Sequence, residues 1–177
     1  MLGETVITRA EVERAVEALA RKIEADLEGR DPVFICVLKG AVYFFTALTQ
    51  RIRHPMVVDF IQASSYGATT ESSGTVTLIK DVTVDIAGKD VYVVEDIVDT
   101  GLTLADVVAL LRARHPRSVQ VVALLSKPSR RKVQVAVDFT GIEIADRFVV
   151  GFGLDFAERF RNLPEIREFV SDGEATP

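Results

Sequence analysis

Residues 93–103 read VVEDIVDTGLT, and this stretch decides the fold. Its first residues end an apolar run at 91–94, which is typical of a strand buried on both faces. Two adjacent acids and then a third follow, and a Thr-Gly-Leu-Thr turn comes after them. From about residue 103 to residue 114, apolar side chains recur at helical spacing, namely Leu104, Val107, Val108 and Leu111. The stretch therefore predicts a strand, a turn and a helix in succession, which is the repeating unit of an α/β sheet.

The same alternation extends to both sides of this stretch. Near the start, Thr8 and Glu11 form a capping-box pattern ahead of an amphipathic helix that Gly29 can end. A second helix-like segment covers about residues 41–52. Further runs rich in β-branched residues predict buried strands at residues 33–38, 57–61 and 119–125. This order predicts a mostly parallel sheet with right-handed crossovers and helices on its faces.

Two segments fall outside the alternation. Residues 64–74 are small and polar, so they predict either a mobile hairpin loop or a lid over a site. The tail at about 133–170 has short apolar runs broken by Asp, Gly and Pro, and it predicts a small accessory lobe. Because 177 residues suit one core and no linker-like stretch interrupts them, we expect residues 1–177 to form a single domain.

The turn after the central strand has the features of a phosphate site. Ligands of open α/β sheets bind at the carboxyl ends of the strands, and a following helix offers free amides and a positive dipole end to an anion. Gly101 lets the backbone come close, and the hydroxyls of Thr100 and Thr103 can donate to phosphate oxygens. The Gly-Lys-Thr/Ser ending of a Walker-type loop is absent.

The three acids beside this turn also need a chemical reason. Adjacent carboxylates are costly unless they face hydroxyl groups, a metal ion or water. The hydroxyls of a polyol such as ribose could donate to Glu95 and Asp96, and Asp99 would face the reacting carbon or an incoming base. The alternative is that all three are solvated loop acids, with Asp99 capping the next helix.

The acidic pair after four apolar residues, followed by Asp-Thr-Gly-x-Thr, resembles the phosphoribosyl-pyrophosphate signature of the type I phosphoribosyltransferases. Four further stretches resemble the hypoxanthine-guanine branch in its short bacterial form, and they occur in the family's order. They are Leu38-Lys39-Gly40, the Ser-Ser-Tyr-Gly at 64–67, Lys127 after an apolar strand, and DRFVVGFGLD at 146–155. The resemblance implies an α/β fold with a central, mostly parallel sheet flanked by helices. It also implies a hood lobe, mainly from residues 133–170, and a flexible hairpin loop at 64–74.

The resemblance further implies an enzyme, a glycosyltransferase. In that family the magnesium complex of phosphoribosyl pyrophosphate reacts with hypoxanthine or guanine, and IMP or GMP and pyrophosphate are released in purine salvage. The transition state resembles an oxocarbenium ion, so the site must bind a cationic sugar and a departing anion most tightly. Because family members are dimers or tetramers, a homodimer or homotetramer is implied.

For the sugar, the resemblance implies that Glu95 and Asp96 hold the ribose hydroxyls, directly or through Mg²⁺. Asp99 is the implied general base, which takes a proton from a purine ring nitrogen. The 5-phosphate is wrapped by Asp99, Thr100, Gly101, Leu102 and Thr103. Leu102 departs from the family, where Lys or another polar residue is common, but only its backbone amide is needed.

For the leaving group, Lys39 and Gly40 match the family's pyrophosphate loop, which often carries a non-proline cis peptide bond. Arg161 matches a second pyrophosphate contact. Ser65 and Tyr66 match the loop that closes over the reacting sugar and excludes water, because water would hydrolyse a cationic intermediate.

For the base, Lys127 is implied to donate to the exocyclic oxygen of a 6-oxopurine, which disfavours adenine. Phe148 is implied to stack on the ring, and Val149 to contact its edge through backbone atoms. Asp155 matches a magnesium ligand, and the family's metal site combines such carboxylates with substrate phosphates.

Composition excludes other classes of function. The formal charge of −5 argues against a general affinity for nucleic acid or for an anionic membrane. No apolar run approaches the roughly 20 residues that span a bilayer, and no signal-peptide pattern is present, so we expect a cytoplasmic protein. The single cysteine, Cys36, lies in a strand-like run and reads as a small buried hydrophobe.

Two competing functions stay open at this point. One is a transferase of the same fold that acts on adenine, orotate, uracil or xanthine; Lys127 and the Phe148–Val149 pair favour 6-oxopurines but leave xanthine open. The other is a regulator that binds phosphoribosyl pyrophosphate without catalysis, because a fold alone does not fix a function. An intact Asp99 and a full Ser65–Tyr66 loop favour catalysis.

Overall fold

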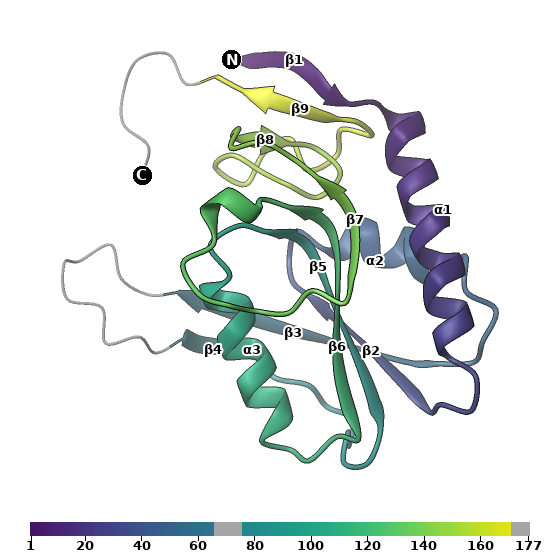
Figure 1. Cartoon of the computed structure of the whole chain (residues 1–177). Helices are drawn as coiled ribbons and strands as arrows, with labels where there is room; N and C mark the ends of the chain where they lie inside the picture. Colours follow the sequence, from purple (N-terminus) through teal and green to yellow (C-terminus); the bar gives the residue numbers. More distant parts are fainter. Residues whose placement is uncertain (66–75, 171–177) are drawn as a thin grey trace.

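The computed structural model of the chain describes residues 1–65 and 76–170. Its centre is a six-stranded sheet in the order β4-β3-β2-β5-β6-β7, and all neighbours are parallel except the antiparallel pair β3–β4 (Figure 1). The strands are β2 (Pro32–Val37), β3 (Val57–Ser65), β4 (Val76–Lys80), β5 (Asp90–Val98), β6 (Ser118–Ser126) and β7 (Phe139–Glu143). The four predicted strands are confirmed, and the predicted mostly parallel α/β sheet with them.

Three helices cover this sheet: α1 (Arg9–Asp26), α2 (Val42–Thr49) and α3 (Leu102–Arg112). The capping box at the start of α1 is present, because the Thr8 amide donates to Glu11 Oε2 at 2.8 Å and the Glu11 amide donates to Thr8 Oγ1 at 3.3 Å. All three helices agree with the predicted segments to within a few residues.

The apolar strands serve two cores, one on each face of the sheet. Within β2, Phe34 and Cys36 pack into the core that includes α1 and α2, whereas Val33, Ile35 and Val37 pack into the core that includes α3. Alternate side chains of a strand point to opposite faces, so a strand buried on both faces must be apolar throughout. Continuous apolar runs in the sequence are therefore the signature of this sheet. The prediction that Cys36 is buried is confirmed.

A second, smaller sheet lies above the central one in Figure 1. Its order is β1-β9-β8, both pairings are antiparallel, and the strands are β1 (Leu2–Ile7), β8 (Val149–Val150) and β9 (Ile166–Phe169). The predicted lobe at 133–170 therefore differs from the structure in two ways. Strand β7 belongs to the central sheet, paired with β6, and β1 contributes to the small sheet from the other end of the sequence.

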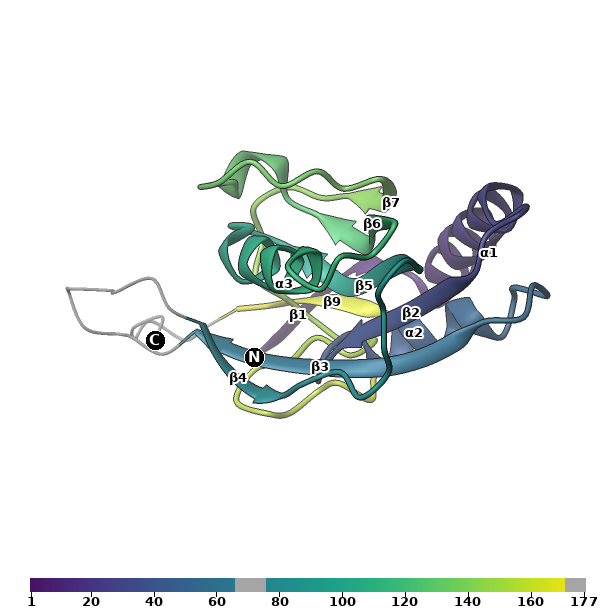
Figure 2. The same ribbon diagram turned by 90° about the horizontal axis from the view of Figure 1, so that it is seen from below.

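The predicted loop at 64–74 falls mostly outside the described residues. Strands β3 and β4, which run side by side in Figure 2, end and begin beside it, at Ser65 and Val76. Tyr66 lies outside the described residues. Within 1–65 and 76–170, no helix is long and apolar enough to cross a membrane.

Candidate active site

The predicted phosphate-binding turn, residues 99–103 and called the phosphate turn below, lies where β5 passes into α3. Gly101 caps α3 with a φ of +82°, and an added Cβ would meet Val135 Cγ1 at 3.0 Å, so both backbone and space favour glycine. The helix starts at Leu102, and the first amides of a helix have no partner within it. The Leu102 amide makes one long hydrogen bond to Thr100 Oγ1, at 3.4 Å, so an anion at this turn would compete with that contact.

An arginine that sequence reasoning missed braces this turn. The Arg131 guanidinium donates to the carbonyl oxygens of Val98 and Asp99, and to Ser126 Oγ at 2.9 Å. The Lys132 amide donates to Thr100 O at 3.0 Å. The segment after the short 3₁₀ helix η1 (Pro128–Arg130) therefore holds the carbonyl groups of the turn in place.

The acidic pair lies inside β5 and not after it, because the strand continues to Val98. Glu95 and Asp96 come from adjacent positions, and the Asp96 amide donates to Glu95 Oε1 at 3.2 Å. Burial, and then the charge of Asp96, raise the pKa of Glu95 well above its usual value, and burial also raises the pKa of Asp96. Two adjacent, poorly solvated carboxylates are stabilised when they share a proton, bind a cation or accept hydrogen bonds from hydroxyl groups.

Asp99 lies between two cations, Lys127 at the end of β6 and Arg130 in η1. Its Oδ2 is 3.7 Å from Lys127 Nζ, and its Oδ1 accepts from Arg130 Nε at 3.2 Å. The pairing of Val98 with Ser126 in the β5–β6 ladder aligns Asp99 with Lys127, which follow them directly. Lys127 is 5% exposed, so its ammonium group is buried at this position.

Arg130 contacts both Asp99 and Asp146, and Asp146 lies just before Phe148 and Val149 in the sequence. Its NH1 group is 3.7 Å from Asp146 Oδ2, and its side chain is about half exposed. The hydrogen bond to Asp99 and that carboxylate's charge raise the pKa of Arg130. Arg130 was not predicted as a site residue, since an arginine in a polar loop carries no signal of its partners.

The predicted pyrophosphate loop packs directly against the acidic pair. The Leu38–Lys39 peptide bond is cis, as the family resemblance implies. A Cβ added to Gly40 would lie 1.8 Å from Asp96 Oδ2, and one added to Gly153 would lie 2.0 Å from Gly40 O. Only glycine therefore lets the loop fit between β5 and the 151–155 turn.

The two predicted pyrophosphate cations converge on a carboxylate that was not predicted, Glu158. Its Oε2 is 3.2 Å from Lys39 Nζ and 3.3 Å from Arg161 NH2. Arg161 NH1 also contacts Asp155 Oδ1 at 2.8 Å and donates to Gly153 O at 2.7 Å. Hydrogen bonds from Lys39 and then Arg161 hold the pKa of Glu158 below its usual value.

Two of the residues predicted to contact the purine, Phe148 and Val149, lie at the beginning of β8 in the small sheet. Phe148 is 48% exposed and packs at steep angles against Phe156 and Phe169, with ring centroids 5.9 and 6.2 Å away. Val149 next to it is buried in β8. A half-exposed ring held by two others offers a rigid surface to a planar ligand.

The predicted metal ligands do not form one cluster. Within residues 1–65 and 76–170, no group of three or more His, Cys, Asp or Glu side chains could hold a metal ion. Glu95 and Asp96 are adjacent, whereas Asp155 is paired with Arg161. Any cation here would take most of its ligands from the substrate and water.

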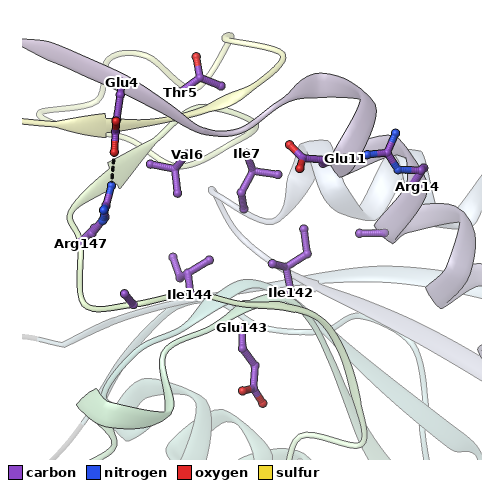
Figure 3. A pocket seen from close by; sticks show the side chains of 12 residues that line it. Glu4, Thr5, Val6, Ile7, Glu11, Arg14, Ile142, Glu143, Ile144 and Arg147 are labelled. Atoms are coloured by element: carbon purple, nitrogen blue, oxygen red, sulfur yellow. Dashed lines mark hydrogen bonds and ion pairs between the residues drawn. The ribbon is translucent and has the colours of Figure 1, made fainter.

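A cavity of about 630 Å³ lies elsewhere, between β1, the first turns of α1 and residues 142–147 (Figure 3). None of the predicted site residues that the structure describes lines it. Arg147 and Glu4 form an ion pair across its wall. The predicted site lies instead beside the carboxyl ends of β2, β5 and β6, which Lys39, Asp99 and Lys127 follow.

Comparisons with known proteins agree with this geometry. The sequence profile of the phosphoribosyl transferase domain matches residues 5–157. The hypoxanthine-guanine phosphoribosyltransferase of Bacillus subtilis is 44% identical over 165 residues, which cover 93% of this chain and 92% of that protein. The bifunctional protein TilS/HprT of Listeria innocua is also 44% identical over 165 residues, but the chain spans only 26% of its length.

A solved structure points the same way. The crystal structure of a hypoxanthine-guanine phosphoribosyltransferase from Bacillus anthracis, with a HEPES molecule in the active site, superposes with a TM-score of 0.92 at 44% identity, covering 96% of this chain and all of that one. The phosphate turn, the acidic pair and the cis loop thus occur in a chain that matches the family over most of its length. The chain belongs to the phosphoribosyl transferase domain family, within the branch of the hypoxanthine-guanine phosphoribosyltransferases.

Proposed function

We propose that this protein transfers the 5-phosphoribosyl group of phosphoribosyl pyrophosphate to a 6-oxopurine, hypoxanthine or guanine, and releases pyrophosphate. The observation that carries the proposal is the meeting of three kinds of group at one edge of the sheet. These are a turn at the start of α3, an acidic pair of which Asp96 is buried and Glu95 partly buried, with a cationic loop beside it, and the Asp99–Lys127 pair. A sugar phosphate, its leaving group and a base each find a complementary partner there.

The donor's sugar phosphate fits the turn and the acids. The free amides at the start of α3, with the Thr100 and Thr103 hydroxyls, bind the 5-phosphate, and Leu102 contributes its backbone amide. The ribose hydroxyls donate to Glu95 and Asp96. Lys39, the backbone at Gly40, and Arg161 bind the departing pyrophosphate, whose negative charge grows as the bond to the sugar breaks.

Asp99 and Lys127 act on the base as a pair. Asp99 accepts the proton that the purine ring nitrogen loses as it bonds to the sugar carbon. Lys127 donates to the exocyclic oxygen, and its buried ammonium group has no acceptor on the amino group of adenine. Phe148 stacks on the ring, and the Val149 backbone contacts its edge.

Glu95 and Asp96 would hold a magnesium ion, and Asp155, which is paired with Arg161, would become a further oxygen ligand only if that ion pair opened. The donor set fits, because burial raises the pKa of both adjacent carboxylates and a cation beside them removes that penalty. Magnesium is usually bound by one or two carboxylates with substrate phosphates and water. When bound, it would neutralise charge on the diphosphate leaving group.

Several further features are part of the proposal. The chain acts as a single domain, with the small sheet as the hood over the base and the 64–74 segment, including Ser65 and Tyr66, as the lid over the sugar. A homodimer or homotetramer in the cytoplasm is the expected form.

A pyrophosphate-release assay with each of hypoxanthine, guanine, xanthine and adenine, with and without magnesium, tests the function. We expect release with hypoxanthine, guanine or both, little with adenine, and none when magnesium is removed. Equal turnover of adenine would contradict the role of Lys127. No release with any base would favour the alternative function, a regulator that binds phosphoribosyl pyrophosphate without catalysis.

A further inference from the structure

The carboxylate of Glu158 lies where the leaving group's two cations meet. It accepts from Lys39 Nζ at 3.2 Å and from Arg161 NH2 at 3.3 Å through one oxygen, Oε2. Lys39 and Glu158 are 119 positions apart in the sequence, so the fold and not local spacing brings them together. An anionic oxygen bridging two cations resembles what a diphosphate oxygen would do between them.

The backbone around Glu158 fixes this arrangement. Ala157, Glu158 and Phe160 all have positive φ angles, and the Glu158 amide donates to Asp155 Oδ2 at 2.9 Å. Arg161 is held in turn by Gly153 O and Asp155 Oδ1. The turn therefore presents the Glu158 side chain toward the pyrophosphate loop from a defined position.

The hydrogen bonds of Arg161 are not all satisfied by the protein. Its Nε is buried and has no hydrogen-bond partner within the described residues. A buried donor without an acceptor is costly, so the present contacts of Arg161 do not satisfy its guanidinium group completely. Glu158 reaches only the NH2 end of the guanidinium group.

We propose that Glu158 is an internal competitor of the diphosphate: it holds Lys39 and Arg161 through its carboxylate, and phosphoribosyl pyrophosphate or pyrophosphate must displace it to bind. The inference rests on the proposed function and adds a residue that sets the affinity of the leaving-group site. Glu158 weakens binding of the donor and the product alike, so pyrophosphate leaves more easily after transfer.

The exposure of the three side chains makes such displacement feasible. The side chains of Glu158 and Lys39 are 64% and 57% exposed, and that of Arg161 is 20% exposed. Ion pairs between exposed groups are weak, so a polyanion with several charges can replace a single carboxylate. Once displaced, Glu158 swings into water, where its charge is well solvated.

Calorimetric titration with inorganic pyrophosphate and magnesium tests this in the full chain. The variants are Glu158→Gln, which keeps the shape and removes the charge, and Glu158→Asn, because Asn tolerates a positive φ angle better than most residues. We expect both to bind pyrophosphate roughly 2- to 30-fold more tightly than the wild type, the range that the loss of two exposed ion pairs allows. The gain should shrink as salt is added.

Two controls separate this effect from others. Glu13→Gln removes the same charge from an exposed ion pair on α1 with Arg9 and should leave pyrophosphate affinity unchanged. In a Lys39→Ala background, Glu158→Gln should gain less, because one of the two cations is already absent.

The result that would overturn the inference is unchanged or weaker pyrophosphate binding by both Glu158 variants, or an equal gain with Glu13→Gln. Purine turnover by the wild type is measured in parallel. A wild type that turns over while the Glu158 variants show no gain refutes the competitor role alone. A wild type that turns over no base refutes the proposed function, and calorimetry still reports on Glu158.

Discussion

Asp99 is held by cations on both of its oxygens, with Lys127 on one side and Arg130 on the other. These contacts fix the orientation of the carboxylate, which its proposed role as general base requires because proton transfer depends on a distance of about 3 Å. Arg130 approaches from a solvent-exposed 3₁₀ turn, whereas Lys127 is buried at the end of β6. One exposed cation and one buried cation thus orient the two oxygens of the carboxylate.

Asp99→Asn should lower kcat by roughly 100- to 10,000-fold, the usual contribution of general base catalysis, because an amide cannot accept the purine proton. The KM for the phosphoribosyl donor should change little, because in the proposed function the backbone amides of the turn, and not this side chain, bind the 5-phosphate. Steady-state kinetics with varied donor measure both. Turnover close to that of the wild type would show that another group takes the proton.

Lys127→Met should lower kcat/KM for hypoxanthine by roughly 10- to 150-fold, because a hydrogen bond from a charged donor is worth about 1.5–3 kcal/mol. Methionine keeps the apolar stem in its buried position while removing the ammonium group. Rates with hypoxanthine and adenine are compared for the variant and the wild type. The preference for hypoxanthine over adenine must fall; an unchanged preference would contradict the assignment.

At this scale the sequence predicts the residues that belong to family motifs and misses those defined by contacts. Arg130, Arg131 and Glu158 act through partners that are 31, 32 and 119 positions away. A charged residue in a polar loop carries no record of a distant partner. By contrast, Gly101 and Gly40 are predictable because a motif reports a backbone requirement directly.

The phosphate turn shows how one element stabilises another. It connects β5 to α3, but its carbonyl groups are bonded by Arg131, which follows η1. Burial lowers the pKa of Arg131, and the charge of Asp99 partly offsets this effect. The shape of the turn therefore depends on a segment outside the strand–turn–helix motif.

Arg131→Lys should raise the KM for the phosphoribosyl donor and lower the free energy of unfolding by about 1–3 kcal/mol. An ammonium group keeps the charge but cannot bond the Val98 and Asp99 carbonyls and Ser126 Oγ together as the planar guanidinium does. Donor kinetics and urea unfolding measure the two effects. A loss of stability without a change in donor KM would mean that Arg131 supports the fold and not the turn.

Among the elements, the buried parallel strands are predictable and the peripheral strands are not. Strand β2 is apolar throughout, and β5 and β6 contain the apolar runs 91–94 and 121–125, because these parts of the strands are buried on both faces. Strand β7 is only half-buried and β1 is largely exposed, so neither has a distinct apolar pattern. The pairing of β1 with β9 joins segments about 160 positions apart, which periodicity cannot report.

On the scale of the whole molecule, one buried acid joins β3 of the central sheet to the segment after β4. Asp59 in β3 accepts hydrogen bonds from the amides of Thr83, Phe60 and Val84. Burial alone would raise the pKa of Asp59, but these hydrogen bonds outweigh it and lower the pKa to about 2. Its ionised form therefore contributes to stability.

Because the pKa of Asp59 is lower in the folded chain than in the unfolded one, its contribution is full above about pH 5 and is lost as the pH falls toward 2. We expect Asp59→Asn to lower the free energy of unfolding by about 2 kcal/mol at pH 7, and this deficit to shrink by about 1 kcal/mol at pH 3. Urea unfolding at several pH values measures it. Asp106→Asn, at an exposed position on α3, is the matched control, and a deficit independent of pH would contradict the linkage.

The register of β5 against β6 has a consequence for how such a chain can change in evolution. Val98 faces Ser126 in the ladder, and Asp99 and Lys127 follow as a pair. One residue inserted into either strand would shift the end of that strand by about 3.3 Å and move the following side chains to the opposite face of the sheet. Asp99 and Lys127 would then no longer lie side by side. Insertions within 90–98 are therefore tolerable only when matched within 118–126. In related sequences we expect insertions and deletions between residues 98 and 118, and a constant length within 90–98 and 118–126.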